Sequence, residues 1–318
     1  MKVVVSAGLP TSIKLVALRI AEANNWEFRP NPFAKRDYDY IVYVSDPRLD
    51  TYLLGKSLPV NRAIIYLISE GPLRYDLKKS LKKHYVVAPT VFVKRMIEKA
   101  DIKVDKVIPH GIEIPTKVRP ISEKKGYFYR AYYLPRKYPD YGLKALDMWL
   151  EKRGHHEDID IYLVGAPYFP KDFIIVSKYP FARIKNPIVH KEMVELYDSH
   201  RFYLNLSDAE GFGLTPLEAM SYGEIVITAY YPAIRDYLPV DCNLVVGIKD
   251  YWLEKIEYEY ILHSEYEPEN YLKALLISEL LNENELEKMS MCNIETAKKF
   301  DYKKVYLEFG KLIEEIAK

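Results

Sequence analysis

The sequence has no glutamine, only two cysteines, no long apolar run and almost no excess of charge. Cys242 and Cys292 could pair, but two cysteines argue against a disulfide framework or a zinc site. No apolar run is long enough to cross a bilayer, and the start lacks the apolar core of a signal peptide. A net charge of +1 argues against a general nucleic-acid binder. We therefore expect a soluble, cytoplasmic protein.

Tyrosine is abundant, with 29 residues, and lysine, glutamate and isoleucine are also frequent. This composition, with few thermolabile side chains, is typical of proteins from a thermophile. A skewed genome composition explains it equally well, so both explanations stay open. The length of 318 residues fits two domains of ordinary size.

Short apolar runs alternate with amphipathic helical patterns along the first third of the chain. Turn or polar residues follow each run, as they follow buried parallel strands. The runs are KVVVSA, YDYIVYVSD, RAIIYLISEG, HYVVAPT and VDKVIPHGIEIP. Residues 1–116 are therefore predicted to form an α/β, doubly wound, Rossmann-like domain.

A polar, basic stretch, Thr116–Gly126, interrupts this alternation and is interpreted as a linker. The alternation then resumes and predicts a second Rossmann-like domain over residues 117–299. From about Asp250 onward we expect mostly charged helices. The last helix, at about 300–318, is expected to cross back to the first domain.

The most informative stretch is EGFGLTPLEAM, Glu210–Met220, which follows the predicted strand FYLNLSD. Thr215 is expected to cap a helix, with Pro216 as its first residue and Glu218 completing a capping box. Gly223 is expected to end this helix.

A helix that starts at the carboxyl end of a parallel strand is a common ligand site in α/β sheets. Free amides near Gly213 and Leu214 suit a diphosphate. Glu210 and Glu218 would repel phosphate, so we expect them to bind hydroxyl groups. A nucleotide-sugar fits, because it carries a ribose diol on one side of its diphosphate and a sugar on the other. As a loop acid, Glu210 is expected to add little to stability.

The stretch SDAEGFGLTPLEAMSYGEIVITA closely resembles the E-x7-E motif of retaining GT-B glycosyltransferases, especially glycosyltransferase family 4. VVAPTVFVKRMIEKADI and VIPHGIEI extend the resemblance, which covers about residues 86–229. It implies the GT-B fold, in which two Rossmann-like domains with parallel sheets face a central cleft. It also implies that a sugar moves from a nucleotide donor with retained configuration and without a metal ion.

By this resemblance, Glu210 faces the donor sugar and stabilises the reacting centre, and Glu218 holds the ribose hydroxyls. Gly213, Leu214 and Thr215 are expected to meet the diphosphate. A plain capping glutamate at 218 and a solvated loop acid at 210 are the simpler interpretations. Neither explains why the two acids occur together in this context.

Members of this family neutralise the leaving diphosphate with an arginine and a lysine that follow the linker. In YFYRAYYLPRKYPDYG, Lys137 aligns with the lysine, but Tyr132 stands where the arginine is usual. Either Arg130 or Arg136 supplies the second cation, or the phosphate contact is weaker. A merely solvated Arg136–Lys137 pair is the alternative.

Three further candidates lie in the first domain. Family members often carry a histidine near the acceptor, where this chain has Ser69-Glu70-Gly71. Glu70 is therefore a catalytic candidate, with a place beside a helix N-cap as its alternative. His110 matches a turn near the interdomain cleft, but a structural histidine fits as well. Gly8 is a candidate donor contact, although AGLPTS lacks the family's twin glycines.

The segment 72–84, PLRYDLKKSLKKH, is expected to be a helix with Leu73, Leu77 and Leu81 inward and its basic residues outward. Such a face is either simply solvated or docks on an anionic membrane.

The sequence thus predicts a glycosyltransferase that uses a UDP-, GDP- or ADP-sugar and no other cofactor. The acceptor, whether sugar, lipid, protein or nucleic acid, is not readable. The alternatives are a GT-B protein that binds a nucleotide-sugar without turnover, and a sugar phosphorylase on the same fold.

Overall fold

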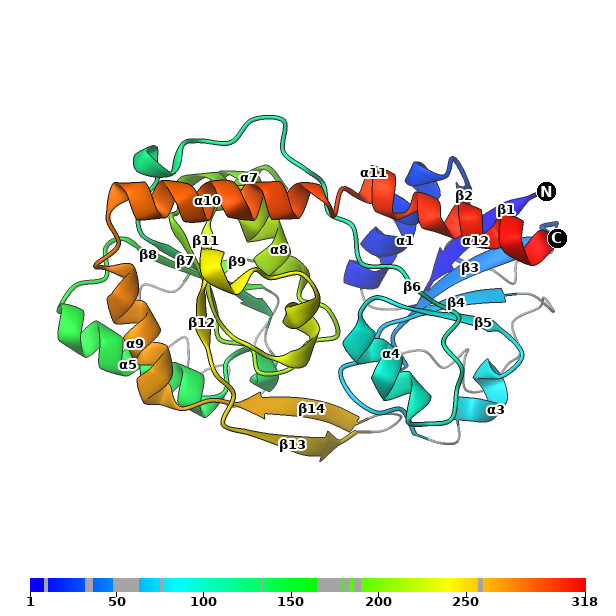
Figure 1. Cartoon of the computed structure of the whole chain (residues 1–318), viewed down its shortest axis with the longest axis horizontal. Coiled ribbons are helices and arrows are strands. Elements are labelled where there is room, and N and C mark those ends of the chain that lie inside the picture. The colour runs from blue at the N-terminus through cyan, green and yellow to red at the C-terminus, as the bar shows by residue number, and fades with distance from the viewer. Residues whose placement is uncertain are drawn as a thin grey trace.

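The chain folds into two α/β halves, each built on a six-stranded parallel sheet (Figure 1). The predicted fold class is confirmed. The structure, a computed structural model, describes residues 1–8, 11–31, 37–47, 63–74, 77–132, 134–164, 179, 183–185, 190–256 and 260–318.

The N-terminal sheet forms from the apolar runs of the first third of the chain. β3 and β4 are buried along their whole length, which explains their continuous apolar sequences. The strand order is β2 (Glu27–Phe28), β1 (Val3–Ala7), β3 (Tyr40–Ser45), β4 (Ala63–Leu67), β5 (Tyr85–Ala88) and β6 (Lys106–Val107). The helices described beside it are α1 (Thr11–Ala23), α3 (Lys78–Leu81) and α4 (Val91–Glu98).

The C-terminal sheet has the strand order of dinucleotide-binding domains. From one edge to the other the strands are β9 (Arg183–Lys185), β8 (Ile159–Val164), β7 (Tyr127–Tyr132), β10 (Phe202–Asn205), β11 (Ile225–Ala229) and β12 (Leu244–Val246). The chain runs outward from β7 to β9 and then returns to pair β10 with β7. The strand order therefore reverses between β7 and β10, where open α/β sheets bind ligands.

Three hydrophobic cores hold these layers together. One lies between the N-terminal sheet and α1 with the C-terminal helix α12 (Leu307–Ala317). Another lies between the C-terminal sheet and the helices α5 (Asp140–Arg153) and α9 (Pro268–Ser278). The third takes side chains from both halves, including Phe92 of α4 and Phe212 of the loop before helix α8 (Leu214–Ser221). This shared core joins the two halves beside the predicted site.

The end of the chain packs on the first half. After α10 (Glu283–Lys298), the helices α11 (Tyr302–Val305) and α12 lie beside α1 and the N-terminal sheet (Figure 1). The Ile112 N–H donates to Phe300 O at 2.8 Å, and the Tyr302 N–H donates to Ile112 O at 3.0 Å.

An antiparallel hairpin, β13 (Asp250–Lys255) with β14 (Tyr260–Glu265), replaces the charged helices expected from Asp250 onward. Helices begin only at α9. The hairpin pairs with the other half, because the Tyr260 N–H donates to Pro72 O at 2.9 Å and the Leu262 N–H to Glu70 O at 3.0 Å. The helical prediction was wrong here because this partner is remote in sequence.

The segment 72–84 buries Leu73, Leu77 and Leu81 as predicted. Among its described residues only Lys78–Leu81 is α-helical, and residues 75–76 lie outside the described part.

Cys242 and Cys292, whose pairing the sequence left open, form a disulfide.

Candidate active site

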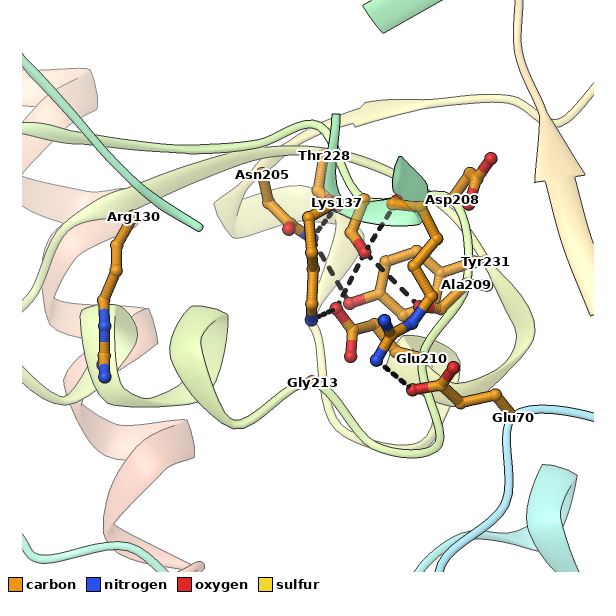
Figure 2. Close-up of polar contacts among 12 residues, drawn as sticks. Glu70, Arg130, Lys137, Asn205, Asp208, Ala209, Glu210, Gly213, Thr228 and Tyr231 are labelled. Carbon is orange, nitrogen blue, oxygen red and sulfur yellow. Dashed lines mark hydrogen bonds and ion pairs between the residues drawn. The ribbon is translucent and has the colours of Figure 1, made fainter. Parts of the chain in front are cut away.

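The predicted lysine and the predicted catalytic glutamate meet at the switch point of the C-terminal sheet. Lys137 ends a 3₁₀ turn (Pro135–Lys137) shortly after β7, and Glu210 lies in the loop after β10. The Lys137 ammonium pairs with Glu210 Oε1, which also accepts a hydrogen bond from Ser207 Oγ at 2.7 Å (Figure 2). The sequence pattern therefore led to two residues that lie in contact.

This pair is largely buried, with the Lys137 side chain 17% exposed and that of Glu210 11% exposed. Burial disfavours the ammonium and lowers the pKa of Lys137, although the nearby Glu210 carboxylate offsets part of this effect. The expectation that Glu210 is a loop acid with little effect on stability does not fit this burial. Its charge compensates a buried cation.

A second ion pair links the two halves. Arg136 Nη2 donates to Glu70 Oε1 at 2.6 Å, and both side chains are almost fully buried. Glu70 follows β4 of the N-terminal half, while Arg136 lies in the 3₁₀ turn of the C-terminal half. Arg136 directly precedes Lys137 in the chain, and Glu70 lies near the Lys137–Glu210 cluster (Figure 2). Glu70 thus belongs to the same site, on its N-terminal side.

Arg130 stands apart from this cluster (Figure 2). Its Nη1 lies 3.5 Å from Glu218 Oε2, and the Tyr197 hydroxyl donates to the same oxygen at 3.2 Å. The two candidate arginines therefore contact different acids. The Tyr132 side chain, which stands at the family's arginine position, lies outside the described part of the structure.

The turn before helix α8 (Leu214–Ser221) differs from its predicted capping. Gly213 is the N-cap, with φ +90°, and no side chain caps the helix. Thr215 is thus the second residue of the helix and Pro216 the third, so the predicted capping box was wrong. A proline can stand third in a helix because the N–H groups of the first turn lack helical partners. The predicted amides at Gly213 and Leu214 still lie at the helix start.

The predicted end of α8 is confirmed. Gly223 follows Tyr222 with φ +76°. The Gly223 N–H donates to Met220 O at 2.9 Å, and the Glu224 N–H to Ala219 O at 3.1 Å. This is the hydrogen-bond pattern of a Schellman motif, which requires a residue in the left-handed region.

His110 is a buried, neutral ring. The Tyr66 hydroxyl donates to Ile108 O at 2.7 Å, so its oxygen must accept from His110 Nδ1 at 2.9 Å. Burial, with a smaller contribution from the Arg19 cation, lowers the pKa of His110 to about 3. Its ring contacts Phe212 with centroids 4.9 Å apart. These contacts fit the structural interpretation, and a role in donor binding stays a prediction.

Gly8 lies at the carboxyl end of β1. Its N–H donates to Val44 O at 3.0 Å and continues the pairing of β1 with β3. The residues after it, 9–10, lie outside the described part. Its predicted contact with the donor therefore stays a prediction.

Sequence reasoning missed Asp208 and His263. His263 on β14 places Nδ1 3.0 Å from Asp208 Oδ1 and Nε2 3.1 Å from Glu254 Oε2. Tyr141 donates to the other Asp208 oxygen, and the Asp208 N–H donates to Arg136 O at 3.1 Å. Asp208 thus joins the Glu210 loop to the turn that carries Arg136 and Lys137. Its place after a parallel strand was a usable signal, whereas the strand YILHSE contains none for His263.

His263 carries a charge in this arrangement. Carboxylate oxygens only accept hydrogen bonds, so both ring nitrogens must donate for both contacts to form. Burial opposes the charge, but the Asp208 and Glu254 carboxylates outweigh it and raise the pKa of His263. The Trp252 ring stacks on the imidazole, with centroids 3.9 Å apart.

Within the described residues, no group of three or more His, Cys, Asp or Glu side chains is arranged to hold a metal ion. Among the same residues, no helix is long and apolar enough to span a bilayer.

Comparisons with known proteins define the class of this fold. The chain superposes along 99% of its length on sucrose-phosphate synthase from Thermosynechococcus elongatus, with 99% of that chain covered, a TM-score of 0.69 and 14% identity. Against the Anabaena protein HepE, solved with UDP and glucose, the TM-score is 0.67 at 11% identity, covering 99% of this chain and 100% of that one. The fold is therefore that of GT-B glycosyltransferases.

Sequence comparison is more specific for the second half. The profile of the family described as "Glycosyl transferases group 1" matches residues 124–254, which include Lys137, Glu210 and Glu218. A provisionally named glycosyltransferase of Sulfolobus islandicus filamentous virus is 26% identical over 180 residues, 55% of this chain and 60% of that protein. Another, from Acidianus filamentous virus 1, is 31% identical over 115 residues, 31% of this chain and 37% of that protein.

Proposed function

We propose that the protein is a retaining glycosyltransferase that moves a sugar from a nucleotide-sugar to an acceptor hydroxyl without a metal ion. The Lys137–Glu210 pair at the switch point, beside the amides at the start of α8, carries this proposal. It brings a cation, an anion and phosphate-binding N–H groups to the sheet edge where nucleotides bind. The group 1 match over the same residues supports this activity.

Sugar transfer breaks the bond between the anomeric carbon and the diphosphate oxygen. A new bond forms from that carbon to the acceptor oxygen, and the acceptor proton passes to the departing diphosphate oxygen. Negative charge grows on the diphosphate as its bond breaks, so Lys137 and the α8 amides contribute most in the transition state. Glu210 accepts hydrogen bonds from the donor sugar in this proposal. Glu70, on the N-terminal side, is assigned to the acceptor hydroxyl.

Each cation of the site is paired with an acid. A donor diphosphate must compete with these carboxylates, and a carboxylate that gives up its cation can then accept hydrogen bonds from sugar or ribose hydroxyls. Donor binding would thus exchange one set of charged contacts for another. The three pairs are Lys137–Glu210, Arg136–Glu70 and Arg130–Glu218.

UDP-sugars are the first donors to test, since HepE was solved with UDP and glucose and the pneumococcal O-GlcNAc transferase GtfA with UDP and GlcNAc. The purified protein is incubated with UDP-, GDP- and ADP-sugars, with and without EDTA, and release of the nucleoside diphosphate is measured. NMR of the product reports the anomeric configuration. We expect release that EDTA leaves unchanged, a retained anomer, and at least 100-fold slower turnover in Glu210→Gln.

Other outcomes would contradict this proposal in distinguishable ways. Nucleotide binding without release would indicate a GT-B binding protein. Turnover that requires inorganic phosphate would indicate a phosphorylase. Loss of activity in EDTA that added Mg²⁺ restores would refute the metal-independent step.

A further inference from the structure

Two buried tyrosine hydroxyls lie at the turn that Gly213 forms. The Tyr237 hydroxyl donates to Gly213 O at 2.6 Å, and Asn205 Nδ2 donates to the Tyr231 hydroxyl at 3.3 Å. Figure 2 shows Asn205 and Tyr231 beside the Lys137–Glu210 cluster. The side chains of Asn205, Tyr231 and Tyr237 are at least nine-tenths buried.

The direction of these two bonds follows from the groups involved. A carbonyl oxygen only accepts, so Tyr237 donates its one proton to Gly213 O. An amide nitrogen only donates, so the Tyr231 oxygen accepts from Asn205 Nδ2. Thr228 confirms the orientation of that amide, because its hydroxyl donates to Ala229 O at 3.0 Å and accepts from Asn205 Nδ2 at 2.9 Å.

Both tyrosines keep their protons at ordinary pH. Burial raises the pKa of Tyr231 and of Tyr237 well above the usual value of 10.0, and the nearby Glu210 carboxylate adds to this effect. Tyr237 therefore keeps the proton that it donates to Gly213 O at neutral and moderately alkaline pH.

The hydrogen bond from Tyr237 to Gly213 O also fixes the direction of the next N–H group, that of Leu214. In a trans peptide the C=O and the following N–H point in opposite directions. The Leu214 N–H therefore points away from Tyr237. Leu214 is the first residue of α8, so this N–H has no acceptor within the helix.

The two hydroxyls also explain why residue 213 is glycine. A Cβ there would lie 2.6 Å from the Tyr231 oxygen and 2.9 Å from the Tyr237 oxygen. The φ of +90° is also unfavourable for other residues. The tyrosines thus occupy the side of the turn that a side chain would need.

We propose that Tyr237 is a positioning residue that holds the Leu214 N–H toward the donor diphosphate through its hydrogen bond to Gly213 O. This inference rests on the proposed function, which supplies the diphosphate. A helix amide that is already oriented binds an anion without the cost of reorganising the turn.

The test removes one hydroxyl and keeps the ring. Tyr237→Phe is compared with Tyr271→Phe, since the Tyr271 hydroxyl is also buried and donates to a backbone carbonyl, Ile227 O, at 2.7 Å. Ile227 lies in β11, where strand pairing already fixes the peptide. Tyr271→Phe is therefore a control for the loss of a buried hydroxyl.

Isothermal titration measures the affinity for UDP, GDP and ADP, and NMR titration measures the affinity for the matching nucleoside without phosphates. We expect Tyr237→Phe to bind the preferred nucleoside diphosphate about tenfold more weakly, the scale of one hydrogen bond to a charged group. Its affinity for the nucleoside should stay unchanged. Tyr271→Phe should bind within twofold of wild type.

Two results would overturn the inference while leaving the proposed function in place. One is wild-type affinity for the nucleoside diphosphate in Tyr237→Phe. The other is a parallel loss of diphosphate and nucleoside, because a general structural defect weakens both. Wild-type protein that binds none of the three nucleoside diphosphates would refute the proposed function, and the inference would fall with it.

Discussion

Removing the charge of Glu210 should destabilise the protein as well as stop turnover. Glu210→Gln keeps the shape of the side chain but leaves the Lys137 ammonium buried without its counter-charge. Breaking a buried ion pair at one partner costs about 3–5 kcal/mol. At roughly 2–4 °C per kcal/mol for a domain of this size, the melting temperature should fall by about 6–20 °C.

The double variant separates the charge from the other effects of the substitution. Glu210→Gln combined with Lys137→Met removes both charges and fills similar volume, so most of the lost stability should return. Turnover should stay abolished in both single variants and in the double variant. Calorimetry and donor-hydrolysis rates on all four proteins measure the two properties independently.

The pH dependence adds a second check on the same pair. Burial lowers the pKa of Lys137, so the folded protein holds this proton less tightly than the unfolded chain does. Stability from this group therefore increases as the pH rises toward the ordinary lysine value of 10.5. Without Glu210 the pKa falls further, so the penalty of Glu210→Gln should shrink between pH 7 and pH 9.5.

Two results would refute this reasoning. A melting temperature of Glu210→Gln within about 1 °C of wild type would show that the ammonium is solvated rather than buried. Additive losses in the double variant would show that the two side chains do not interact.

We expect Arg136→Ala to lower kcat by roughly 100-fold and Arg130→Ala mainly to raise the KM for the donor; equal effects in steady-state assays would contradict their separate places. Since Asp208 raises the pKa of His263, the stability contributed by the charged imidazole is complete below pH 6.5 and is lost as the pH rises through the pKa of His263 in the folded state. His263→Gln should therefore cost more stability at pH 5.5 than at pH 8.5 in urea titrations, and a constant cost would exclude a charged imidazole. Reducing the disulfide, which spans 50 residues, should remove about 4 kcal/mol in the chain-entropy estimate, and an unchanged melting temperature would rule this out. If residues 72–84 contact membranes, anionic vesicles should sediment the wild type at low salt but not a variant with its exposed lysines changed to glutamate.

The sequence predicted those features that follow from local periodicity. Continuous apolar runs predicted the buried parallel strands, and the strand–turn–helix pattern around Glu210 placed that acid at a strand end. The alignment of Lys137 with the family lysine placed it in the same site as Glu210, and the two side chains, 73 positions apart, lie in contact. This contact follows because the carboxyl ends of neighbouring parallel strands share one edge of the sheet.

What the sequence did not predict depends on partners remote in the chain. His263 meets Asp208, 55 positions earlier, through a hairpin whose own pattern looks like charged surface. The cap of α8 failed for a different reason. Thr215 and Glu218 have the spacing of a capping box, but Gly213 can start the helix earlier because it adopts a positive φ. Heat adaptation and cytoplasmic location stay predictions.

The two halves of the protein touch through bare backbone at two glycines. A Cβ on Gly71 would lie 1.9 Å from Tyr260 O, and one on Gly211 would lie 2.7 Å from Ser69 O. Even an alanine at either position would clash with the backbone of the other half and force the two halves apart. Substrate exchange in a two-domain enzyme requires opening and closing, and this step often limits turnover. If the proposed enzyme opens and closes between substrates, the absence of a Cβ at Gly71 and Gly211 sets how closely its two halves can approach, and substitutions at these positions should change the rate of that motion.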